Sequence, residues 1–125
     1  MVRGRTTALP DHADAIYGAA VTACRDRDAA ADVTVLVCAA AARESEPPAR
    51  RRLVERAILA AMRSAPARPF AAMAPGDREA VALARLAGYS EAEVADALGL
   101  DAGAVRARLL RGLRALAGAR PVAAA

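Results

Sequence analysis

Residues 90–117 read SEAEVADALGLDAGAVRARLLRGLRALA, and this stretch decides the fold of the second half of the chain. Ser90 and Glu93 form a capping box, which starts a helix. Gly99 ends that helix after a few residues, because glycine readily takes the left-handed conformation found past a helix end. Asp101 is a good N-cap for a second, longer helix. The stretch therefore predicts a short helix, a tight turn and a longer basic helix, the plan of a helix-turn-helix.

The longer helix, residues 102–117, has an apolar and a basic face when its residues are placed about 100° apart. The apolar face holds Val105, Leu109, Gly112, Leu113 and Leu116, which we expect to pack on Val94, Ala95 and Leu98. The outward face holds Gly103, Ala107, Leu110, Arg111 and Arg114, with Arg106 on its flank. Residues 102–120 contain five Arg and no acid. Because an ordinary solvated face mixes both signs of charge, this one favours DNA binding.

Outward from this stretch, the chain divides into two helical lobes. Pro75 opens a further helix with acids near its positive end, and Gly88 ends it. Before that helix, we expect others over residues 11–24, about 28–43 and about 49–64. The predicted domains are a flexible arm (1–10), an N-terminal helical lobe (11–64), a Pro-rich linker (65–75), a helix-turn-helix domain (76–118) and a tail (119–125).

The composition favours helices throughout. The 125-residue sequence contains 38 Ala and 18 Arg, and it has no Lys, Asn, Gln or Trp. Ala and Arg are among the best helix formers, whereas the β-branched and aromatic residues typical of strands are sparse. An all-α fold of two small lobes is therefore predicted. The net charge of +4 and the pI near 10.0 suit a nucleic-acid partner.

Several classes of function lack the residues they need. Cys24 and Cys38 form no CxxC pair and the chain has one His, so we expect free thiols and no zinc site. His12 has no obvious Ser or Cys partner for a catalytic triad, and Ser90 is occupied as a cap. The longest uncharged run in the helical segments, residues 33–42, is too short to cross a bilayer. We therefore expect no enzyme, no metal, no cofactor and no membrane partner, and a cytoplasmic location.

Residues 75–116 resemble region 4 of bacterial sigma factors, especially the extracytoplasmic-function group. The resemblance rests on Arg78-Glu79, Gly88-Tyr89-Ser90, Glu93-Val94-Ala95, Leu98-Gly99 and Gly103-Ala104-Val105-Arg106-Ala107-Arg108-Leu109, without a gap. LuxR-type effector domains use nearly the same spacing. The Arg-rich ending, residues 108–116, favours the sigma factors.

This resemblance implies that DNA binds to the second helix of the motif. In the family, the first exposed turns of that helix read bases of the −35 element in the major groove. Small side chains occupy those positions here, and none can make a bidentate contact with a base edge. Arg106 and Arg111 remain for phosphate or guanine, and Leu110 for a thymine methyl group, so we expect salt-dependent binding with weak sequence preference. The candidate DNA-binding residues are Ala102, Gly103, Ala104, Arg106, Ala107, Leu110, Arg111 and Arg114.

The first lobe is similar, in shorter stretches, to the start of sigma region 2. These stretches are Ile16-Tyr17, Asp26-Arg27 and Ala30-Ala31-Asp32-Val33-Thr34. The family then has a Gln-Glu pair that docks on the clamp of core RNA polymerase, and Val35-Leu36 stand in its place. The resemblance thus implies that Asp32, Val35 and Leu36 bind a partner. The segment that opens the −10 element in the family is shortened here and has no aromatic residue, and its Arg50–Arg52 are expected to face water.

Three functions follow from these observations. The first, which we favour, is a sigma-factor-like transcription protein that binds promoter DNA and core RNA polymerase. The second is a stand-alone regulator with a LuxR-like reading head, whose first lobe is a module for self-association or another partner. The third is a degenerate sigma-like protein that titrates polymerase or an anti-sigma factor.

Overall fold

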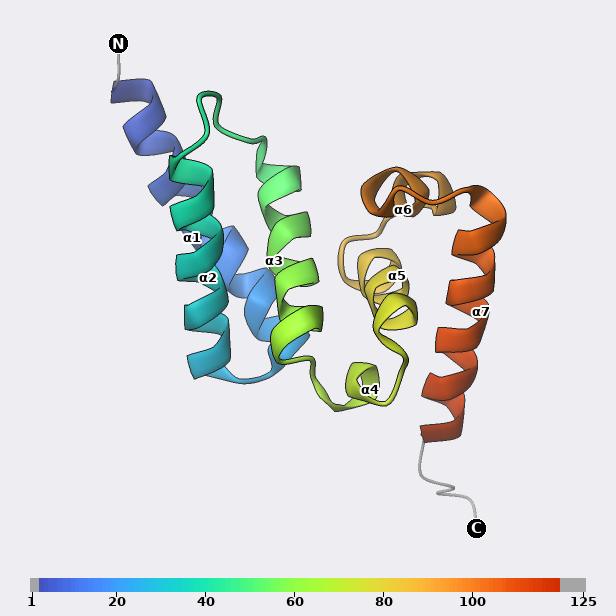
Figure 1. Ribbon diagram of the computed structural model, residues 1–125. Coiled ribbons are helices and arrows are strands. Elements are labelled where there is room, and N and C mark those ends of the chain that lie inside the picture. Colours follow the sequence, from blue (N-terminus) through green and yellow to red (C-terminus); the bar gives the residue numbers. More distant parts are fainter. Residues whose placement is uncertain (1–2, 120–125) are drawn as a thin grey trace.

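The structure is a computed structural model that describes the backbone of residues 3–119 and the side chains of residues 12–118 (Figure 1). This part of the chain forms helices joined by short loops, without a strand. The helices are α1 (Arg3–Cys24), α2 (Arg27–Ala42), α3 (Arg50–Ser64), α4 (Arg68–Ala71), α5 (Pro75–Leu86), α6 (Glu91–Leu98) and α7 (Ala102–Ala119). The predicted all-α fold is confirmed.

The structure contains the capping interactions that the sequence predicts for the helices of the second half. The Ser90 hydroxyl accepts a hydrogen bond from the Glu93 N–H at 3.2 Å, and the Glu93 carboxylate accepts one from the Ser90 N–H at 2.8 Å. Gly88 and Gly99 follow α5 and α6 with φ values of 70° and 66°, which favour glycine. The Asp101 carboxylate caps α7 by accepting a backbone hydrogen bond at 2.8 Å. The helix-turn-helix is therefore set by local capping.

The first lobe is a bundle of α1, α2 and α3, which all pack on one another (Figure 1). Small side chains let the helices approach closely, and a few large ones fill the centre. Its fully buried residues are Ile16, Ala20, Ala23, Ala30, Leu53, Ala57, Ile58 and Ala61. The Val-rich middle of α2 is helical as predicted. Val33 and Val37 lie one helical turn apart, so both side chains reach the core on the same side of the helix and are buried there.

Two boundaries differ from the predicted ones. The first helix begins at Arg3, so most of the expected arm is helical backbone, while residues 1, 2 and 120–125 lie outside the described part. The expected linker contains α4 and contributes Ala67, Phe70 and Met73 to the core. The Ala67 N–H also donates to the Ala23 carbonyl at 2.9 Å. Apolar residues spaced three apart bury this segment, so it does not act as a free tether.

Helix α5 joins the two lobes, since it packs on α3 on one side and on α7 on the other (Figure 1). Its four consecutive residues 80–83 are all fully buried, which requires cover on more than one face. Arg78 donates to the carbonyls of Met62 at 3.2 Å and Met73 at 2.9 Å. The Arg63 guanidinium pairs with the Glu79 carboxylate at 2.7 Å. The buried residues of both lobes therefore form one continuous core.

Candidate nucleic-acid interface

The recognition helix α7 is held by contacts along its inner face. Val94 of α6 and Val105 of α7 are fully buried, as the helical wheel predicts. Farther along α7, Gly112 is buried and lies directly against Val81 of α5. The helix therefore leans on α5 as well as on α6.

The contact at Gly112 corrects one prediction. Leu113, expected to point inward, is 43% exposed. The face of α7 that meets α5 is centred on Gly112, and the next residue projects about 100° away from it. Leu113 consequently joins Leu110 on the outside, where Leu110 is 48% exposed as expected.

The structure brings most of the predicted DNA-binding residues together on the outside of α7. Ala102, Gly103, Arg106, Leu110, Arg111 and Arg114 are exposed. Ala104 and Ala107 are half-buried between the exposed positions. Over its first turn this face has only small side chains, so another surface can approach the backbone closely there.

The arginines of this face differ in their surroundings. Arg106 pairs with Glu91 of α6 at 3.0 Å, and this hydrogen bond raises the pKa of Arg106. Arg111 makes two hydrogen bonds to the buried carboxylate of Asp77, at 3.2 and 3.3 Å. Arg114 has no carboxylate within 4.0 Å among the residues that the structure describes. Arg106 and Arg114 are therefore the cations best placed to reach a ligand.

Sequence reasoning missed both carboxylates that hold these arginines. Asp77 lies among the acids expected near the positive end of the helix that Pro75 opens, and the sequence analysis assigned Glu91 no role. The pairs span 34 residues for Asp77 with Arg111 and 15 for Glu91 with Arg106. No local pattern connects residues so far apart. A signal existed for Asp77, since an acid in the first turn of a helix lies at the positive end of the helix dipole.

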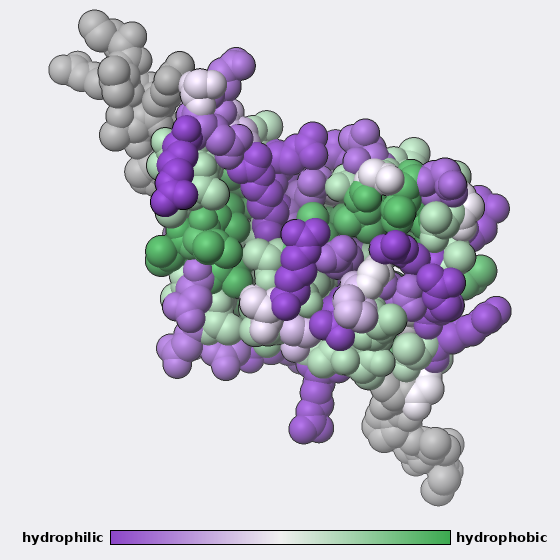
Figure 2. All heavy atoms as spheres, in the orientation of Figure 1, coloured by the Kyte–Doolittle hydropathy of each residue, from purple (hydrophilic) through white to green (hydrophobic). Residues whose placement is uncertain are grey.

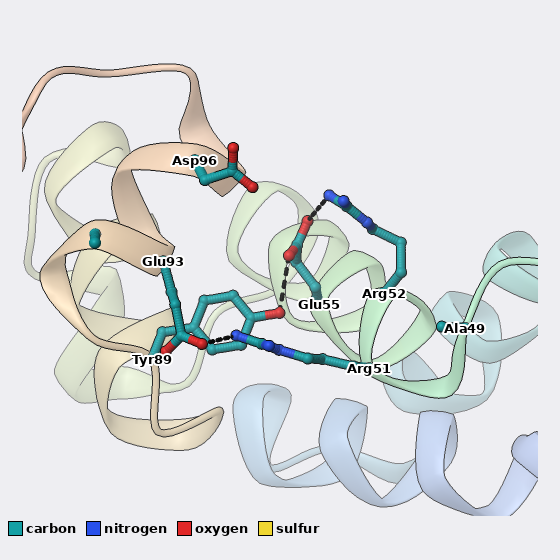
Figure 3. Close-up of a pocket in the computed structure, with 8 residues that line it drawn as sticks. Ala49, Arg51, Arg52, Glu55, Tyr89, Glu93 and Asp96 are labelled. Carbon is teal, nitrogen blue, oxygen red and sulfur yellow. Dashed lines mark hydrogen bonds and ion pairs between the residues drawn. The ribbon is translucent and has the colours of Figure 1, made fainter.

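A polar cluster joins the start of α3 to the start of α6 (Figure 3). The Tyr89 hydroxyl donates to the buried Glu55 carboxylate at 2.8 Å, and Arg52 pairs with the same carboxylate at 3.2 Å. The Arg51 guanidinium lies 4.6 Å from the centre of the Tyr89 ring and bonds to Glu93. Desolvation and the bond to Glu55 raise the pKa of Tyr89. Of the three arginines expected to face water, Arg51 thus links the two lobes, whereas Arg52 pairs with Glu55 within α3.

The groove beside this cluster, about 360 Å³ in volume, carries both signs of charge. Arg51, Arg52 and Glu55 come from α3 on one side of it, and Glu93 and Asp96 come from α6 on the other (Figure 3). The Ser90 backbone N–H and the Arg51 guanidinium lower the pKa of Glu93, so its negative charge is well maintained. Such a mixed groove does not attract a phosphate strand, and we assign it to holding the lobes together.

Replacing Tyr89 with Phe is expected to lower the free energy of unfolding by about 1–2 kcal/mol, because the buried Glu55 carboxylate loses a hydrogen bond. Urea denaturation measures the change. Tyr17→Phe is the matched control: that residue is 36% exposed, and the loss of its hydroxyl should change stability by less than about 0.5 kcal/mol. If the two substitutions lowered stability equally, the Tyr89–Glu55 hydrogen bond would not stabilise the contact between the lobes.

The predicted partner-binding residues lie together on the outside of α2. Val35 is 68% exposed and Leu36 63% exposed, and Asp32 is exposed one turn before them. Figure 2 shows hydrophobic atoms at the surface in the region of α2. Because Val33 and Val37 are buried on the opposite side, α2 presents apolar side chains both to the core and to solvent.

The remaining candidate chemistry is limited in the part of the chain that the structure describes. Cys24 and Cys38 are free thiols, and burial raises the pKa of Cys24. Over the same residues there is no group of three or more potential metal ligands. No helix within residues 3–119 has the length and apolar character needed to cross a membrane.

Comparison with known proteins finds one family on these same elements. Residues 70–116 match the family model of Sigma-70, region 4. The match covers less than half of the chain, begins in α4 and ends in α7, and so contains α5, α6 and most of α7. No curated protein and no solved structure matches the chain. Region 4 is a DNA-binding, transcription-related domain and not a catalytic one. Residues 70–116 are therefore similar to a sigma-70 region 4 domain.

Proposed function

We propose that the chain is a sigma-factor-like transcription protein that binds promoter DNA through α7 and core RNA polymerase through its first lobe. One observation carries this proposal. The segment matched as region 4 folds into a capped helix-turn-helix whose second helix has an outward face with arginines and no acid of its own.

The outward face of α7 fits the major groove of duplex DNA in a particular way. The first turn of this face is Ala and Gly, so the helix backbone can approach the base edges closely there but cannot form bidentate contacts with them. Arg106 and Arg114 would bind phosphates, and Leu110 would contact a thymine methyl group. This arrangement supports binding dominated by phosphate contacts, with weak sequence preference.

The first lobe offers a separate surface for polymerase. Asp32, Val35 and Leu36 are exposed together on α2, on the other lobe from the DNA-binding face of α7 (Figure 1). Exposed apolar residues of this size are typical of protein interfaces. A polymerase subunit bound there would leave α7 free for DNA. A complex of this kind acts in the cytoplasm, and the free thiols of Cys24 and Cys38 suit that reducing compartment.

The exposed apolar pair on α2 also favours a second candidate, a sigma-like protein that titrates polymerase or an anti-sigma factor. Co-elution of the protein with core RNA polymerase on a sizing column, together with DNA binding at low salt, separates the candidates. Polymerase binding without DNA binding supports titration. DNA binding without polymerase binding supports a stand-alone regulator.

Replacing Arg106 and Arg114 with Ala is expected to weaken binding to a duplex. It should also reduce the slope of log affinity against log salt by about 1 for each phosphate that the variant no longer binds. Fluorescence anisotropy at several salt concentrations measures both quantities. The control double variant Arg27→Ala and Arg43→Ala removes the same two charges from exposed arginines at the ends of α2, far from α7, and should leave the slope unchanged. If the double variant keeps the wild-type affinity, α7 is not the helix that binds DNA.

A further inference from the structure

The two paired arginines of α7 are held to very different degrees. The Asp77 side chain that binds Arg111 is 10% exposed, and it receives two hydrogen bonds. The Glu91 side chain that binds Arg106 is 44% exposed and receives one hydrogen bond, while Arg106 itself is 67% exposed. A buried carboxylate that loses its partner is left unpaired away from water, whereas an exposed one is readily solvated. Arg111 is thus a fixed clamp, and Arg106 can exchange its partner.

Glu91 also occupies a particular place in the motif. It is the first residue of α6, the helix that crosses the DNA backbone when a helix-turn-helix docks. Its carboxylate contacts the guanidinium that a phosphate would use. A phosphate that approaches Arg106 must therefore displace a group of its own sign, which then remains close by.

We propose that Glu91 is an electrostatic gate on Arg106 that limits the affinity of the chain for duplex DNA. In the free protein, the Glu91 carboxylate occupies the Arg106 guanidinium, and a DNA phosphate replaces it on binding. This inference rests on the proposed DNA-binding function and identifies a residue that tunes it.

The gate changes how the affinity for DNA depends on salt concentration. A phosphate contact releases counterions from DNA, which makes affinity fall with salt. When Arg106 leaves Glu91 for a phosphate, the freed carboxylate attracts a cation from solution, and this uptake offsets the release. Arg106 therefore adds less to the salt slope in the presence of Glu91 than it does in its absence.

The test is a salt titration of the full chain with a random-sequence duplex of about two helical turns. The Glu91→Gln variant keeps the length of the side chain and one oxygen that can accept a hydrogen bond from Arg106, but it removes the charge. It should bind about threefold to tenfold more tightly at low salt, with a salt slope steeper by up to about 1. Asp96→Asn removes the same charge farther along α6, where no cation pairs with it in the described part of the chain, and should change affinity less than about twofold.

A double-variant cycle shows whether the effect runs through Arg106. In the Arg106→Ala background, Glu91→Gln should gain less than about twofold, because no guanidinium remains to be released. The gate is wrong if Glu91→Gln lowers or keeps the affinity, if Asp96→Asn gains as much, or if the gain persists without Arg106. If replacing Arg114 lowers the affinity for DNA and Glu91→Gln leaves the affinity unchanged, the gate is refuted and the proposed DNA-binding function stands. If no variant binds duplex DNA at low salt, the proposed function falls and the gate falls with it.

Discussion

Gly112→Leu is expected to lower the free energy of unfolding by about 2–3 kcal/mol, because the α7 backbone at this position touches α5. A Cβ added to Gly112 would collide with a Val81 methyl group and would lie 3.4 Å from the Asp77 carbonyl oxygen and from the Met73 sulfur. Leucine forms helices far better than glycine, so any loss of stability reports packing rather than propensity. Chemical denaturation of the purified variant measures the change.

Gly118 provides the matched control, because it lies in the same helix and no other described part of the chain comes within 4 Å of an added Cβ. Gly118→Leu should keep or raise stability by up to about 1 kcal/mol, through helix propensity alone. If both substitutions act alike, α7 does not pack on α5 through its glycine. The affinity of the Gly112→Leu variant for DNA should fall as well, because the added side chain displaces α7 from its position against α5 and α6.

The second large effect is expected when the first lobe is removed. Residues 65–125 alone should lose most of their cooperative unfolding transition, because α5 then lacks the cover of α3. Its buried residues 80–83 face both neighbours, and the removal also takes away the partners of Tyr89, Glu79 and Glu93. Circular dichroism during a thermal melt measures helicity and cooperativity. Full-length protein should melt in one transition.

Fragment complementation tests whether residues 65–125 can still fold when the first lobe is supplied as a separate peptide. Adding a separate peptide of residues 1–64 should restore helicity to residues 65–125, because the contacts between the lobes do not depend on chain continuity. A fragment that melts cooperatively on its own, near the temperature of the whole protein, would show that the shared core contributes little.

The sequence predicts those features of the structure that depend on interactions between residues close together in the chain. Ser90, Glu93, Gly99 and Asp101 act within one helical turn, and each does what its position predicts. The amphipathic face of α7 is also local in this sense. The helix-turn-helix and most of its outward face were therefore predictable from the sequence.

The features that the sequence did not predict depend on contacts across the fold. Three prolines in residues 65–75 indicated a linker, but Phe70 and Met73 bury themselves once both lobes are present. Arg111 was predicted as free for DNA, and it pairs with Asp77 because α7 leans on α5. The same lean turns Leu113 outward. A helical wheel gives directions around one helix, and it contains no information on which neighbour that helix meets.

The buried segment between the lobes has a thermodynamic consequence. With one core, the two halves share a single folding equilibrium, and a molecule that binds only the folded chain shifts that equilibrium by mass action. Polymerase held at Val35 and Leu36 would raise the fraction of molecules whose α7 is ready for DNA, and DNA held at α7 would do the same for the surface on α2. Under the proposed function, the two binding events would thereby be linked through the folding equilibrium, without a change of shape passing between the two sites.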